Sequence, residues 1–169
     1  MALVTCRECQ HEVDQVARKC PHCKAPNPGR ADWQGTGREW KTSTTVCGYP
    51  LIHIAYGRNW QGKLRVAKGV IAIGQFAIGL ITIAQFGVGF IFGFGQFILG
   101  LSAFAQAAIT PLIGIGQLAT GYMALGQITF GYYALGYYAL GVYSWGVNHR
   151  DVEALTFFAR FLPFLRAPD

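Results

Sequence analysis

Four cysteines near the start of the chain have the spacing of a metal site. Cys6, Cys9, Cys20 and Cys23 form the pattern C-x2-C-x10-C-x2-C. Two closely spaced thiolate pairs supply the four soft ligands that a tetrahedral Zn2+ ion prefers. The alternative, two disulfides, requires an oxidising compartment, and Met1–Thr5 runs directly into Cys6 and charged residues without the pattern of a signal or transit peptide. We predict one structural zinc ion, without an open coordination position, in a cytoplasmic protein.

The residues around these cysteines are typical of a zinc ribbon. The segment from Cys6 to Cys23 resembles the short zinc ribbons that begin many small bacterial proteins, although Gln10 and Lys24 stand where such ribbons usually have glycine, at the cost of some backbone strain. His11 and His22 are expected to face solvent rather than bind metal. Acidic residues are interleaved with the basic ones, so the segment does not favour nucleic-acid binding, whereas a protein partner is possible.

No other group of residues indicates catalysis. The chain has no Ser/His/Asp set and no phosphate-binding loop followed by lysine, and all eight acidic residues lie outside the central repeat. We therefore predict that the protein is not an enzyme and has neither catalytic nor cofactor-binding residues. His53, between Ile52 and Ile54, is expected to be a core or cap residue, and Cys47 a small buried hydrophobe.

The centre of the chain is an uncharged repeat with a period of five. The run from Gly69 to Asn148 contains no Asp, Glu, Lys, Arg or His. Counted from Gly69, with single extra residues near Phe94 and Ile115, the first position is Gly in twelve of fifteen units. The fourth position is small in twelve, and the third and fifth are mostly large and apolar. A helix would scatter glycines spaced by five around its axis, so a repeated β structure explains the pattern better.

Two of the units carry a resemblance to a known family. Gly74-Gln75-Phe76-Ala77-Ile78 and Ala84-Gln85-Phe86-Gly87-Val88 resemble the pentapeptide repeat, whose units form the sides of a square coil. The resemblance covers about half the chain and implies a four-sided β-solenoid. Gln recurs in every other unit at positions 75, 85, 96, 106, 117 and 127. With a coil of four units and one bulge, these glutamines would stack in two ladders, and about four coils would rise roughly 19 Å.

The large apolar residues of the repeat predict its function. Members of the pentapeptide-repeat family present polar residues to solvent, whereas here the fifth position carries residues such as Ile78, Ile83 and Leu125. A narrow coil cannot bury both the third and the fifth positions, so one apolar set must face lipid or other protein. Tyrosines at the end of the repeat fit either a membrane-interface belt or stacked core ladders.

The flanks are expected to cap the repeat. We divide the chain into a zinc ribbon (1–25), a linker (26–41), a β-hairpin cap (42–68), the solenoid (69–147) and a capping helix with a tail (148–169). The apolar spacing from Asp151 to Leu162 predicts a short amphipathic helix, N-capped by Asn148 or Asp151 and stopped by Pro163. This helix can cap the last coil or lie in a lipid interface through Phe157, Phe161 and Phe164. The run Gly48–Gly57 resembles a family of uncharacterised bacterial proteins with apolar repeats and no established activity.

The predicted fold is therefore mainly β, and three function classes follow. The first is a structural, membrane-associated scaffold whose apolar repeat contacts lipid or like subunits. The second is a membrane protein with three or four helical spans from the uncharged tract, although only Thr110-Pro111 offers a polar turn between spans. The third is a soluble, DNA-mimicking pentapeptide-repeat inhibitor, which requires an acidic surface that the repeat lacks. The net charge of +6 lies mostly in the flanks.

Overall fold

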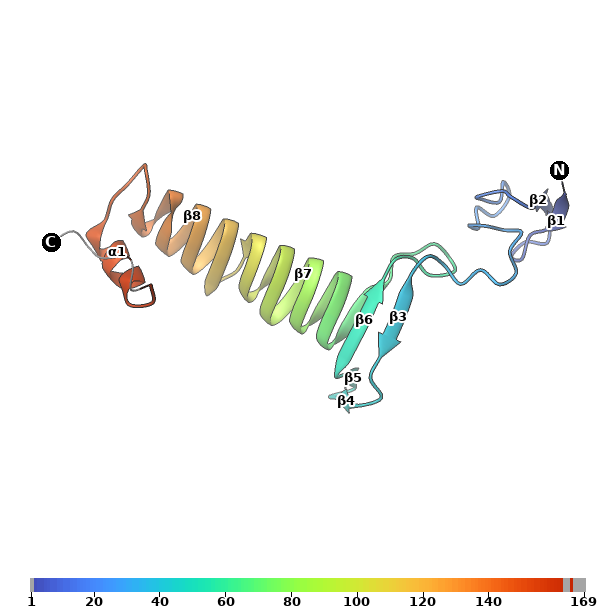
Figure 1. Cartoon of the computed structure of the whole chain (residues 1–169), viewed down its shortest axis with the longest axis horizontal. Helices are drawn as coiled ribbons and strands as arrows, with labels where there is room; N and C mark the ends of the chain where they lie inside the picture. The colour runs from blue at the N-terminus through green and yellow to red at the C-terminus, as the bar shows by residue number, and fades with distance from the viewer. Residues whose placement is uncertain (1, 163–164, 166–169) are drawn as a thin grey trace.

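The computed structural model describes residues 2–162 and 165 of the chain. The fold is mainly β, with one short helix. Figure 1 shows three parts in line: a small N-terminal unit, a long ribbon that winds in successive turns, and a C-terminal helix against the last turn. Pro163 and Phe164, which the sequence assigned to the helix stop and to a lipid contact, lie outside the described residues.

The N-terminal unit is held by one small antiparallel sheet. It pairs β1 (Leu3–Thr5) with β2 (Glu12–Asp14). The packing continues beyond the predicted boundary at residue 25, because Pro28 is fully buried and its carbonyl accepts a hydrogen bond from the Arg7 amide.

A hairpin precedes the winding ribbon. Its arms are β3 (Arg38–Lys41) and β6 (Ile52–Tyr56), and β4 (Thr45–Val46) and β5 (Tyr49–Pro50) form a smaller hairpin at its tip. The predicted linker therefore ends in a strand, and β3 covers the outer edge of the sheet β3-β6-β7-β8. Three charged residues, Arg38, Glu39 and Lys41, lie on this edge strand, where charge discourages pairing with another chain.

The winding ribbon is β7 (Val66–Ile109) followed by β8 (Ile113–Trp145). The strands occupy the residues for which helical spans were the alternative, so that alternative does not describe this tract. Among residues 2–162 and 165, no helix is long and apolar enough to cross a membrane.

Each turn of the ribbon contains two five-residue units rather than four. Ser102 pairs in parallel with Ile113, and Val147 donates a backbone hydrogen bond to Tyr137, which are offsets of eleven and ten residues. The expected coil of four units is therefore wrong, because four units make two turns. About eight turns at the spacing of neighbouring strands give a stack of roughly 38 Å.

The glycines of the repeat are required by contacts between turns. A Cβ on Gly116 would overlap the carbonyl oxygen of Ala105, and one on Gly126 would overlap that of Gly116. These two glycines are therefore steric requirements of the fold. The obstacle is the backbone of the preceding turn.

The interior of the ribbon consists almost entirely of small side chains. The fourth position of the units is buried in most turns, with Ala72, Ala108, Ala124 and Ala134 all 0% exposed. Ile98 is the large exception, and Gly93, at which a Cβ would overlap Ile98 Cγ2, leaves room for it. With an interior this thin, the third and fifth positions both face outward, whereas the sequence suggested that only one of them does.

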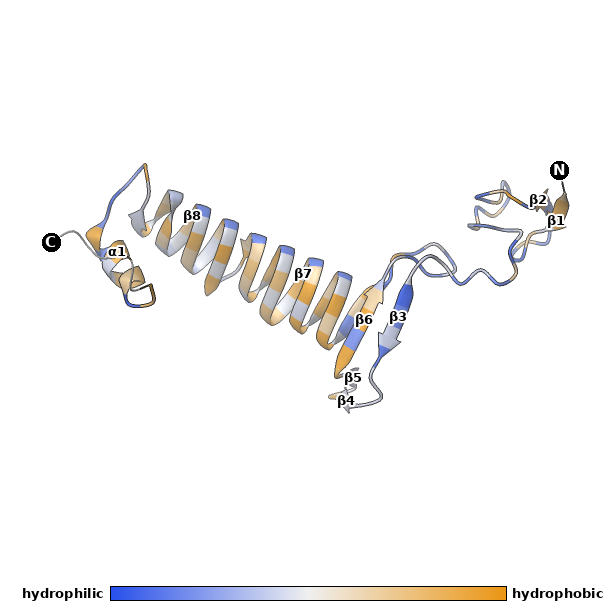
Figure 2. Cartoon of the chain, in the orientation of Figure 1, coloured by the Kyte–Doolittle hydropathy of each residue, from blue (hydrophilic) through white to orange (hydrophobic). Residues whose placement is uncertain are grey.

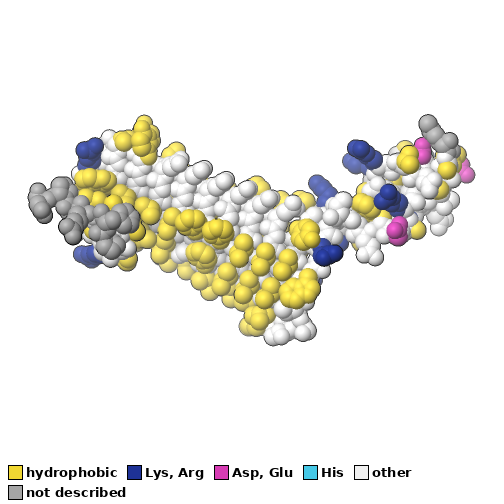
Figure 3. Space-filling view, in the orientation of Figure 1, with side chains coloured by type: hydrophobic (Ala, Val, Ile, Leu, Met, Phe, Trp, Pro, Cys, Tyr) yellow, Lys and Arg dark blue, Asp and Glu magenta, His cyan; other side chains and the backbone are white. Residues whose placement is uncertain are grey.

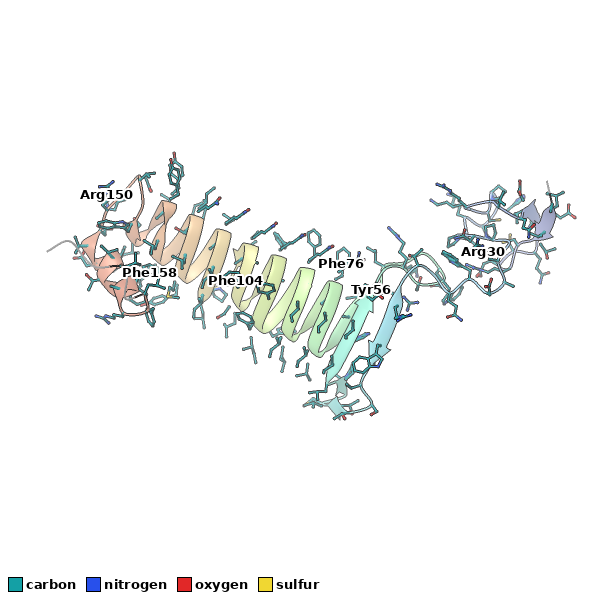
Figure 4. All side chains as sticks on the ribbon, viewed as in Figure 1. Arg30, Tyr56, Phe76, Phe104, Arg150 and Phe158 are labelled. Carbon is teal, nitrogen blue, oxygen red and sulfur yellow. The ribbon has the colours of Figure 1, made fainter. Side chains whose placement is uncertain are left out.

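Both ends of the ribbon are covered. At the C-terminal end, the Asn148 side chain pairs with the backbone N–H and C=O of Ala139 at 3.0 and 2.6 Å, as another turn would. The helix α1 (Val152–Ala159) then packs against β8 through Leu155 and Phe158 (Figure 4). This arrangement favours the capping role of the helix, and the Asp151 side chain accepts a hydrogen bond from the Ser144 amide instead of capping the helix.

Candidate metal centre and apolar surface

The four predicted cysteines come together in space. Their Sγ atoms all lie within 4.8 Å of one another. Cys6 Sγ is 3.7 Å from Cys23 Sγ, and Cys9 Sγ is 3.6 Å from Cys20 Sγ. Four sulfurs at Zn–S bonds of about 2.3 Å would be about 3.8 Å apart in a tetrahedron, so the cluster has the dimensions of a four-thiolate zinc site.

Two equivalent backbone turns present the cysteines. The amides of Gln10 and Lys24 donate to the carbonyls of Cys6 and Cys20 at 2.9 and 3.0 Å. Gln10 and Lys24 have φ angles of 60° and 61°, which is the left-handed conformation that glycine adopts without strain. The strain expected from these two substitutions is therefore present, and all four ligands keep their places.

The electrostatics of the cluster favour thiolates at two positions. Backbone amides of Cys9 and Glu8 lower the pKa of Cys6 to about 6, and the Cys23 amide lowers the pKa of Cys20. The Ala25 amide lowers the pKa of Cys23, but burial and the three neighbouring sulfurs outweigh it and raise this pKa to about 12. A divalent cation at the centre would stabilise all four thiolates, and its binding would release protons.

The two histidines are placed outside the cluster. His11 and His22 are exposed and stack on each other with ring centroids 4.2 Å apart. The His11 ring contacts the carbonyl of Cys9 at 3.0 Å. Neither histidine belongs to the group that could hold a metal ion, in agreement with their predicted position.

His53 is built into the cap of the ribbon. It is 4% exposed, and its Nδ1 lies 2.7 Å from the Lys68 amide nitrogen and 3.0 Å from the Lys68 carbonyl oxygen. Nε2 is 3.3 Å from Glu39 Oε1 without the angle of a hydrogen bond. Lys41 and Arg65 also contact the Glu39 carboxylate at 2.7 Å, and the hydrogen bond from Lys41 is the main cause of its lowered pKa. These contacts fasten β3, β6 and the start of β7 together.

Cys47 differs from its predicted environment. It is exposed, in the two-residue turn between β4 and β5, with φ of 51° followed by Gly48 at 81°. Positive φ at both central residues is the geometry of a type I′ hairpin, which lifts the thiol to the loop tip. Cys47 lies outside the four-cysteine motif, and nothing in its sequence neighbourhood predicted that it would be exposed.

The outward positions of the repeat form a large apolar surface. Side chains project along both edges of the winding ribbon, Phe76 among them (Figure 4). Phe86, Phe104 and Leu140 are 48%, 49% and 54% exposed even though neighbouring turns cover part of each side chain. Aromatic side chains one turn apart stack, as Phe76 does with Phe86 and Tyr122 with Tyr132. The tyrosines thus form ladders on the outside of the ribbon rather than in its interior.

The glutamines of the repeat gather on one edge. Because a turn contains two units, the six regularly spaced glutamines fall on one ladder instead of the two that were expected. Figure 2 shows the corresponding hydrophilic band along one edge of the turns. Among the described residues, the stacked glutamine side chains do not form the expected hydrogen bonds with one another. Within this ladder, only the Gln75 side chain forms a hydrogen bond in the described part of the chain, accepting from the Gly57 amide at 3.2 Å.

Hydrophobic side chains gather on the opposite edge, next to the hairpin β4–β5 (Figure 3). A groove of about 510 Å3 runs there between the hairpin and the first turns. It is lined by Val46, Cys47, Tyr49, Lys68, Gly69, Val70, Ile78, Gly79, Leu80 and Phe90. A second open groove of about 640 Å3 lies where Ser102 interrupts the large side chains between Ile91 and Ile113.

Comparison with protein-family models, with curated proteins and with solved structures finds no match for this chain.

Proposed function

We propose that the protein is a non-enzymatic structural scaffold made of a zinc-ribbon head and a two-sided β-solenoid with two units in each coil. The outer surface of the solenoid associates with a membrane or with copies of the same chain, on the cytoplasmic side. The observation that carries this proposal is that the interior is already filled by small side chains, so the large apolar residues have no core to enter. An apolar exterior of this extent calls for a non-aqueous partner.

The backbone of such a coil tolerates an apolar environment. Successive turns pair with each other, β3 covers the first edge, and Asn148 and α1 cover the last. A structure whose backbone hydrogen bonds are satisfied internally can place its flanks against lipid.

The four-cysteine cluster supports one structural zinc ion in the head. The Arg7 guanidinium donates to the Trp60 carbonyl at 2.8 Å, which ties the head to the loop before β7. A head fixed beside the ribbon can offer its remaining surface to a protein partner.

Three lysine substitutions test the apolar surface. Ile78 and Ile83 are 39% and 45% exposed, and Leu125 is partly exposed. The variant Ile78→Lys/Ile83→Lys/Leu125→Lys should keep its β circular dichroism and leave the membrane or assembled fraction, because a lysine in an apolar contact costs several kcal/mol. The matched control, Gln85→Lys/Gln96→Lys/Gln127→Lys, adds the same charge on the polar edge and should fractionate like the parent. A parent that is a lipid-free monomer would contradict the proposal.

A further inference from the structure

The positive charge of the chain is concentrated in the segment that precedes the winding ribbon. Residues 38–68 contain six Lys or Arg residues and one acidic residue, a net charge of +5 out of the total of +6. The acidic residue, Glu39, is already paired with Lys41 and Arg65. The tract that follows, from Gly69 to Asn148, carries no charge. Arg38, Arg58 and Lys63 lie toward the glutamine edge, where the Gly57 amide donates to Gln75. Lys41 and Lys68 lie toward the apolar edge, on either side of His53. Because Lys41 is paired with Glu39, Lys68 is the cation that this edge offers to an anionic bilayer.

Lys68 stands where these two features meet. It lines the groove together with Val70, Leu80 and Phe90, which hold the second position of alternate units. Leu80 is 42% exposed and Phe90 is 60% exposed. Its backbone is held by His53, and its ammonium group has no ion pair among the described residues. An exposed cation at the mouth of an apolar groove suits a ligand with an acyl chain and a negatively charged head.

We propose that this edge, with the groove at Lys68, is a binding surface for bilayers containing anionic phospholipid. The apolar edge faces the acyl chains, Lys68 contacts the headgroups, and the glutamine ladder faces water. The inference rests on the proposed function and selects membrane, rather than a second copy of the chain, as the partner of this edge.

The test is co-sedimentation of the zinc-loaded full chain with vesicles of phosphatidylcholine alone or mixed with phosphatidylserine. We expect about fivefold tighter binding to the mixed vesicles, as one cation near a charged membrane implies. This preference should weaken as salt is raised from about 0.1 to 0.5 M because ions screen Lys68. Lys68→Gln should weaken binding about fivefold, as the loss of one cation near a charged membrane implies. Lys19→Gln in the N-terminal unit removes the same charge and should have no effect on vesicle binding.

A second pair of variants tests the orientation. Leu80→Glu and Gln85→Glu add one negative charge at the second position of neighbouring units, on opposite edges of the ribbon. Leu80→Glu should abolish vesicle binding, and Gln85→Glu should bind within about twofold of the parent, since it remains in water. Circular dichroism checks that both variants keep the β fold. Equal loss in both variants would overturn the orientation.

The remaining outcomes separate this inference from the proposed function. Equal binding to both vesicle types overturns the preference for anionic lipid and leaves a general membrane scaffold. Absence of vesicle binding together with defined oligomers in analytical ultracentrifugation overturns the lipid partner and supports assembly of copies. A monomer without vesicle binding overturns both.

Discussion

The N-terminal unit, with its four-cysteine cluster, and the winding ribbon owe their order to different interactions. The chain up to Arg30 has one small buried cluster, formed by Cys6, Val13 and Cys20, so the cysteine cluster is its main source of structure. The winding ribbon has no large core either, but each turn is paired with the next through its backbone. The contrast shows two ways to order a chain without a conventional hydrophobic core. One depends on a cluster of four cysteine side chains, and the other on a repeated backbone contact.

Removal of zinc should have the largest effect on stability, and this effect should be confined to the N-terminal unit. Structural zinc contributes about 10–16 kcal/mol in small zinc domains, so chelation should unfold the chain up to Arg30. Hydrogen exchange should show lost protection at Gln10 and Lys24, whose amides close the two turns, and unchanged protection in β7 and β8. Cys20→Ser should act like the chelator, and Cys47→Ser, outside the cluster, should act like the parent. Lost protection in β7 on chelation would show that the two units are coupled.

The second test breaks the repeated backbone contact. Gly126→Val would force a branched side chain onto the carbonyl of Gly116, so its cost should be at or above the upper end of the roughly 0.5–3 kcal/mol range that is typical of point mutants. Thermal unfolding followed by circular dichroism measures it. The control is Gly48→Ala, where nothing lies within 4 Å of an added Cβ and the left-handed φ alone costs about 1–2 kcal/mol. Similar melting temperatures for Gly126→Val and the parent would contradict the close stacking of turns.

The sequence predicted the local features of both regions. The cysteine spacing indicated the ligand cluster, since a pair separated by two residues closes a turn with little help from the rest of the chain. The glycine period indicated a repeated β structure, and the apolar spacing after Asn148 indicated the helix. Each of these signals depends on neighbours within a few residues.

The size of the coil could not be read from the same signals. A period of five is compatible with two or four units per turn, and the resemblance to square coils favoured four. The glutamine spacing indicates the number of units per turn, because a residue that recurs in every other unit lies at the same place in successive turns of two units. The interior was also predicted incompletely, since only one of the third and fifth positions was expected to face outward, whereas the small fourth position fills a narrow interior. Phe92 and Ile113, which seemed to break that rule, are exposed, and Gly93 and Gly114 take the buried places.

Two adjacent alanines test the narrow interior. Ala108 is fully buried, whereas Ala107, one residue earlier, is partly exposed and pairs with Leu118 in the next turn. Ala108→Leu should destabilise the protein by about 1–3 kcal/mol because it overpacks the interior. Ala107→Leu should change stability by no more than about 0.5 kcal/mol, as most surface changes do. Denaturant unfolding followed by β circular dichroism compares them, and equal effects would place the core elsewhere.

The smallest expected effect concerns the Glu39 cluster that joins the cap to the ribbon. The hydrogen bond from Lys41 lowers the pKa of Glu39. A lowered folded-state pKa stabilises the fold above the unfolded value, near 4.5, and this contribution is lost as the pH falls through the folded pKa. Because the carboxylate is about one-third exposed, Glu39→Gln should cost less than about 1 kcal/mol at pH 7.

The pH profile distinguishes this role from a purely steric one. The difference in melting temperature between Glu39→Gln and the parent should shrink as the pH is lowered below about 4.5, since the protonated carboxyl resembles the amide in shape and charge. Acid also releases metal from the cysteine cluster, but it does so equally in both proteins, so the difference between them isolates Glu39. A difference that is independent of pH would mean that the carboxylate charge does not fasten β3 to the first turn, and that the edge strand is held by its backbone pairing with β6 alone.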